Sequence, residues 1–88
     1  MKYQVTRQGD PTEALGAYSG YRIRLVAQRD RESGLVAIRV FYRGSESLPE
    51  HAVPVVARAV DTAEEALELG YGLAVEWIDR MDGADAMP

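Results

Sequence analysis

The residues of this 88-residue chain best suited to binding chemistry are arginines spaced two apart in strand-like segments. Residues 21–28 and 35–43 both alternate in polarity, so every second side chain falls on one side of a strand. A segment at 55–60 adds one more arginine. The candidate binding residues on the shared side are Arg22, Arg24, Arg39, Phe41, Arg43 and Arg58, here called the arginine face. Guanidinium groups bind carboxylate or phosphate, and an exposed aromatic ring can stack on a base or anchor a protein contact.

Three interpretations fit the arginine face. Antiparallel sheets commonly expose one face covered by arginine, so a solvated surface is the simplest. Alternatively, the face around Phe41 buries against a second copy of the chain or another protein, since arginine and aromatic residues are typical interface anchors. The third interpretation is binding of single-stranded nucleic acid. Protein binding, by a homodimer or an accessory module, is the leading functional hypothesis, ahead of nucleic acid.

Catalytic candidates are few. His51 follows Glu50, which suggests a general base oriented by a carboxylate, but adjacent side chains usually point apart and no Gly-x-Ser-x-Gly nucleophile turn exists. Gly70-Tyr71-Gly72 resembles part of a dinucleotide fingerprint, yet it falls inside an expected helix and Val75 replaces the third glycine. The sequence therefore predicts a non-enzymatic protein, with His51 as a surface loop residue.

Metal and cofactor sites are not expected. The chain has no cysteine, which excludes disulfides, zinc-thiolate sites and thiol catalysis. Glu64, Glu65, Glu68 and Asp79 lie on one expected helix, and carboxylates on an open helix face bind hard ions only weakly. A solvated helix face explains these acids better.

One long amphipathic helix organises the expected fold. Residues 61–81 have a helical period, with Asp61 expected as the N-cap and Glu64 as its capping-box partner. Gly72 falls on its polar side. The stripe expected to face the sheet consists of Ala63, Leu67, Gly70, Ala74, Trp77, Ile78 and Met81.

The other segments predict an antiparallel sheet. Residues 21–28 and 35–43 form a hairpin, 44–54 a loop and 55–60 a third strand. Residues 2–7 would supply a fourth strand, and Pro11 favours one helical turn from residue 10 to 15. The predicted fold class is α+β, with a three-stranded or four-stranded sheet and one long C-terminal helix packed on one face, in the order (β)βββα.

Composition places these elements in a single domain. Residues 1–20 form its N-terminal segment, 21–81 its core and 82–88 a flexible tail. The formal charge is zero over residues 1–20, +3 over 21–60 and −7 over 61–88, which predicts a basic sheet side opposite an acidic helix side. Neither a membrane span of roughly 20 apolar residues nor an apolar signal segment is found, so we expect a cytoplasmic protein without membrane contact.

Two resemblances bear on these expectations. Tyr18-Ser19-Gly20-Tyr21 leads into the hairpin, residues 61–66 (Asp-Thr-Ala-Glu-Glu-Ala) open the helix and Trp77-Ile78-Asp79 closes it. This pattern resembles small uncharacterised bacterial domains, which implies a small bacterial protein and carries over no catalytic residue. The order strand, strand, strand, helix is also similar to double-stranded-RNA-binding domains. That family holds phosphates with lysines where this chain has Glu64 and Glu65, so the similarity is limited to topology.

Overall fold

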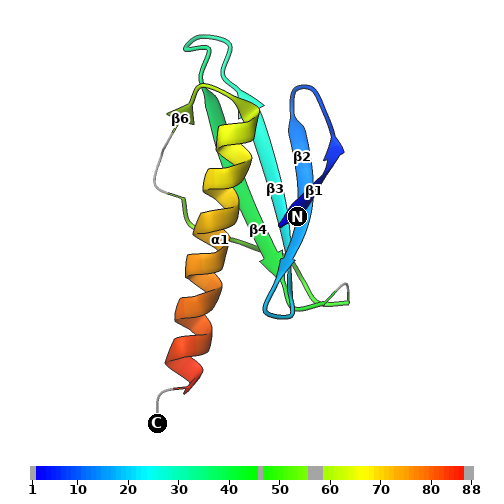
Figure 1. Ribbon diagram of the computed structural model, residues 1–88, viewed down its shortest axis with the longest axis vertical. Helices are drawn as coiled ribbons and strands as arrows, with labels where there is room; N and C mark the ends of the chain where they lie inside the picture. Colours follow the sequence, from blue (N-terminus) through cyan, green and yellow to red (C-terminus); the bar gives the residue numbers. More distant parts are fainter. Residues whose placement is uncertain (1, 46, 56–58, 87–88) are drawn as a thin grey trace.

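The structure, a computed structural model, describes residues 2–45, 47–55 and 59–86, with side chains as far as Met81. It is an α+β fold in which one C-terminal helix lies across one face of an antiparallel sheet (Figure 1). The described strands and the helix are β1 (Tyr3–Arg7), β2 (Thr12–Tyr18), β3 (Tyr21–Arg29), β4 (Val36–Arg43), β5 (His51–Ala52), β6 (Ala59–Val60) and α1 (Ala63–Ala86).

The strands are ordered β1-β2-β3-β4-β5, and β6 also pairs with β4. The predicted hairpin of β3 and β4 is confirmed, as is the strand at residues 2–7. The expected count of three or four strands is too low, because β2 and the two-residue strand β5 add to the described sheet.

β2 corrects the prediction of a helical turn at residues 10–15. Its inward-facing positions carry small residues such as Ala14 and Gly16, so the chain shows too little apolar alternation to predict a strand. Pairing with β3 along all seven residues of β2 overrides the local preference. A Cβ at Gly16 would lie 2.9 Å from the Lys2 carbonyl oxygen and 3.3 Å from the Tyr71 ring, so glycine lets β1 and the helix approach β2.

The third predicted strand, at residues 55–60, is shorter than expected. Within it, Ala59 and Val60 pair with Ala37 and Val36 of β4. Residues 56–58 lie outside the described part of the chain, as does any role of Arg58 in the arginine face. The expected loop 44–54 contains β5, which pairs with the other end of β4.

The helix starts and ends differently from the prediction. Thr62 is the N-cap instead of Asp61, since its hydroxyl accepts a hydrogen bond from the Glu65 amide at 3.1 Å. Glu65 follows Thr62 at the same three-residue spacing at which Glu64 follows Asp61. The sequence alone therefore favours neither Asp61 nor Thr62 as the N-cap. The helix continues to Ala86, and residues 82–86, expected in the tail, are therefore helical.

The buried stripe of α1 agrees with the prediction at its centre. Of the expected residues, Leu67, Gly70, Ala74 and Ile78 are buried, whereas Ala63, Trp77 and Met81 are half-buried. Ala66 and Tyr71 are buried as well. They face the core formed by inward residues of the central strands, namely Ala14, Ile23, Leu25, Ala27, Val36, Ile38 and Val40.

The first strand is fastened to the helix by polar and aromatic contacts. Glu68 accepts hydrogen bonds from Lys2 at 3.0 Å and from the Tyr3 hydroxyl at 3.2 Å. The Tyr3 and Tyr71 rings lie 5.8 Å apart, and the Tyr71 hydroxyl donates to the Ala17 carbonyl.

No helix in the described residues is long and apolar enough to span a membrane.

Candidate functional site

The sheet register places most of the arginine face on one surface. In an antiparallel pair, directly opposed residues share a side. Arg22 opposes Arg43, Arg24 opposes Phe41 and Val26 opposes Arg39, so the four described arginines and Phe41 lie on the side away from the helix. The register thus brings five of the six predicted residues onto one face, and the position of Arg58 is not described.

Arg24 has several contacts on this surface. Its Nε and an Nη atom donate to the two carboxylate oxygens of Glu50, at 2.9 and 2.8 Å. Its other Nη atom lies 3.6 Å from Glu13, and its guanidinium carbon lies 4.3 Å from the centre of the Phe41 ring. A guanidinium plane can engage a carboxylate fork and an aromatic face at once. Arg24 is thus fixed in position and partly neutralised.

The ionisation of this cluster follows from its geometry. Hydrogen bonds from Arg24 lower the pKa of Glu50, against an opposing effect of desolvation, and Arg43 contributes through its charge. Hydrogen bonding to Glu50 in turn raises the pKa of Arg24, which is partly offset by burial. Both groups are charged at neutral pH, so the pair is an ionic contact under physiological conditions.

The row through Arg24 also carries apolar surface. Leu15 of β2 opposes Arg24, and Ala52 of β5 opposes Phe41, which gives the order Leu15, Arg24, Phe41, Ala52 across the sheet. Leu15 is 52% exposed. This exposed leucine lies on β2, next to Arg24 of β3.

A small pocket lies beside this row. It has a volume of about 110 Å³, and its lining residues are Leu15, Gly16, Arg22, Ile23, Arg24, Arg43 and Glu50. Arg22 and Arg43 have further interactions within the protein. Arg39 lies outside this pocket and instead borders a hollow next to Phe41 and Val53.

Glu13 and Leu15 are members of the face that the sequence pattern did not predict. Both lie on β2, and their placement follows only once residues 12–18 are recognised as a strand. The alternation of Glu13 and Leu15 with Thr12 and Ala14 is the pattern that indicates a strand here, although the small inward-facing residues make it weak. Glu50 was expected only as a partner of His51.

His51 lies on the other side of the sheet from Arg24. It opposes Tyr42 in the register, and the His51 and Tyr42 rings are 5.6 Å apart. Glu50 directs both carboxylate oxygens to Arg24. The Glu50 and His51 side chains therefore lie in different surroundings. In this arrangement Glu50 does not orient His51 as a general base.

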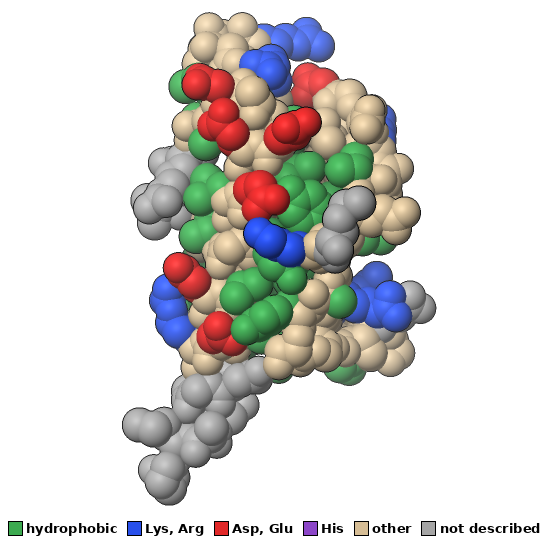
Figure 2. Space-filling model, viewed as in Figure 1, with side chains coloured by type: hydrophobic (Ala, Val, Ile, Leu, Met, Phe, Trp, Pro, Cys, Tyr) green, Lys and Arg blue, Asp and Glu red, His purple; other side chains and the backbone are tan. Residues whose placement is uncertain are grey.

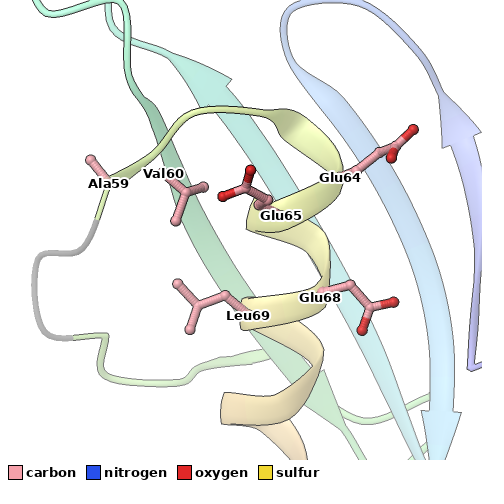
Figure 3. Close-up of a pocket in the computed structure, with 6 residues that line it drawn as sticks. All are labelled: Ala59, Val60, Glu64, Glu65, Glu68 and Leu69. Carbon is pink, nitrogen blue, oxygen red and sulfur yellow. The ribbon is translucent and has the colours of Figure 1, made fainter.

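The helix side of the molecule is different in character. Acidic side chains are spread along the helix (Figure 2). A hollow of about 550 Å³ lies between the start of α1 and β6. Its lining residues, labelled in Figure 3, are Ala59, Val60, Glu64, Glu65, Glu68 and Leu69. Among the described residues, no three His, Asp or Glu side chains lie close enough together to hold a metal ion.

Comparisons of the chain with protein-family models, curated proteins and solved structures gave no significant match. The site is therefore interpreted from its own geometry and charge.

Proposed function

We propose that the protein is a non-enzymatic binding module that recognises an acidic, partly apolar segment of another protein on its arginine face. The observation that carries the proposal is the row Leu15, Arg24, Phe41, in which an arginine stacked on an aromatic ring lies beside an exposed leucine. Arginine and aromatic residues are enriched among the residues that contribute most to protein binding.

Rigidity of the surface supports this function. β3 and β4 pair along eight positions, and Arg24 is held by contacts to Glu50 and Phe41. A partner that binds a preformed surface does not have to order these side chains, which reduces the entropic cost of association.

Charge supports an acidic partner. Arg22, Arg39 and Arg43 surround the central row on the same face. Their charges attract carboxylates and raise the association rate at low ionic strength. The exposed Leu15 adds a contact that discriminates an apolar side chain from a simple anion.

Single-stranded nucleic acid is the second candidate, favoured by the arginines and Phe41. One feature of the face counts against it. Arg24 lies over the Phe41 ring at 4.3 Å, on a face of the ring where a base would otherwise stack.

Selection from a random displayed-peptide library, followed by fluorescence polarisation with the synthesised peptides, tests the proposal. We expect the selected peptides to combine Asp or Glu with at least one large apolar residue. Leu15→Glu should weaken their binding at least tenfold, because it adds a like charge at the centre of the contact. Leu48→Glu is the matched control, since Leu48 is 53% exposed but lies in the loop after β4.

Three results would overturn the proposal. Selected peptides without acidic residues, or peptides bound equally by both variants, would remove the arginine face from the interaction. Tighter binding of a random 12-nucleotide single strand than of the peptides, at about 150 mM salt, would assign the face to nucleic acid. A dimer that light scattering detects at rising concentration, and that Leu15→Glu abolishes, would assign the face to a second copy of the chain.

A further inference from the structure

The pocket beside Leu15 brings like charges together. Arg22 and Arg43 are directly opposed across β3 and β4, and Arg24 is two residues along β3 on the same face. Arg22 and Arg43 also have further interactions within the protein. Three guanidinium groups and one carboxylate, that of Glu50, are among the described residues that line this pocket.

Glu50 shows how the pocket accommodates an anion. Its carboxylate receives two hydrogen bonds from Arg24 and is further stabilised by the charge of Arg43. Glu50 comes from the segment just before β5, outside the four long strands that form the face. A carboxylate of another chain could therefore bind beside the Glu50 carboxylate or replace it at these arginines.

The geometry points to a carboxylate-binding subsite in this pocket, which takes one Asp or Glu side chain of the partner and in which Glu50 acts as an internal competitor. This inference rests on the proposed function and specifies where on the arginine face the acidic group binds. The volume of about 110 Å³ accommodates one carboxylate. Leu15 forms an apolar wall for the methylene groups that lead to that carboxylate.

The internal competitor has a testable effect on affinity. Glu50 both engages the Arg24 fork and repels an incoming carboxylate. Removal of its charge with Glu50→Gln should therefore strengthen binding of an acidic peptide by about two- to fivefold, which is the scale of a partly exposed ion pair. Glu13→Gln is the matched control, because Glu13 also contacts Arg24 but is not among the residues that line the pocket.

The cationic wall is tested in the same assay with the selected peptides. Arg22→Gln should weaken binding about tenfold or more, as expected for loss of a charge-assisted hydrogen bond. Arg39→Gln removes the same charge from the same face outside the pocket and should cost less. Replacement of each peptide Asp or Glu by its amide should identify one carboxylate whose loss no longer matters in Arg22→Gln.

The outcomes separate this inference from the proposed function. Peptides that depend on Leu15 but bind Arg22→Gln and Arg39→Gln equally would overturn the subsite and leave the binding face intact. Weaker binding to Glu50→Gln than to the parent would overturn the competitor role. Absence of any acidic peptide that depends on Leu15 would overturn the proposed function itself.

Discussion

Two glycines of α1 should respond in opposite ways to the same substitution. Alanine is better than glycine in a helix by about 1 kcal/mol, so Gly70→Ala and Gly72→Ala start with the same intrinsic gain. Gly72 is exposed, and a Cβ there meets nothing within 4 Å. A Cβ at Gly70 would lie 2.7 Å from Ile38 Cγ1 and 3.2 Å from Leu25 Cδ2.

The magnitude follows from the packing around Gly70. Ile38 is 6% exposed and Leu25 is fully buried, so neither can move aside without disturbing the core. Overpacking of this kind costs about 1–3 kcal/mol, which equals or exceeds the helix gain. We expect Gly72→Ala to stabilise by about 0.5–1 kcal/mol and Gly70→Ala to be 1–3 kcal/mol less stable than Gly72→Ala.

Urea unfolding followed by circular dichroism measures both free energies, and 1 kcal/mol corresponds to about 5 °C in the melting temperature of a chain this size. Equal stabilisation by both substitutions would refute the close approach of the helix to β4. Ile38→Ala provides a check, because it removes the clashing atoms. The double variant Gly70→Ala/Ile38→Ala should have a free energy of unfolding about 1 kcal/mol or more above the value expected from adding the two single-variant changes.

Two further predictions concern the polar contacts. Glu68→Gln weakens the attachment of Lys2 and Tyr3, so amide hydrogen exchange in β1 should become faster, whereas Glu76→Gln, elsewhere on the helix, should leave it unchanged. Unaltered exchange in β1 would mean that the Glu68 contacts do not hold the strand. Because Arg24 lowers the pKa of Glu50 in the folded protein, the pair adds stability above the unfolded pKa of about 4.3 and loses it as pH falls through the folded value. The stability difference between the parent and Glu50→Gln, at most about 1 kcal/mol, should be constant from pH 7 to 5 and shrink below about pH 4; a difference that grows on acidification would contradict this sign.

The local pattern of the chain was sufficient for the hairpin and the helix. Polarity alternates clearly in β3 and β4, and α1 repeats its apolar residues at the helical period, so each element can be recognised without its neighbours. The same alternation placed Arg22, Arg24, Arg39, Phe41 and Arg43 on one face. These features depend on backbone periodicity, which the order of residues specifies directly.

Tertiary structure decided the elements whose local preference is weak or misleading. β2 carries alanine and glycine inward and is a strand because β1 and β3 pair with it on both sides. The Arg24 and Glu50 contact joins residues 26 positions apart, and no periodic pattern relates them. The sequence by itself thus determined which side chains share the arginine face, through the period of each strand. Only the tertiary structure decided that Leu15 lies beside them and that Glu50 neutralises their centre, because both depend on which segments pair across the sheet.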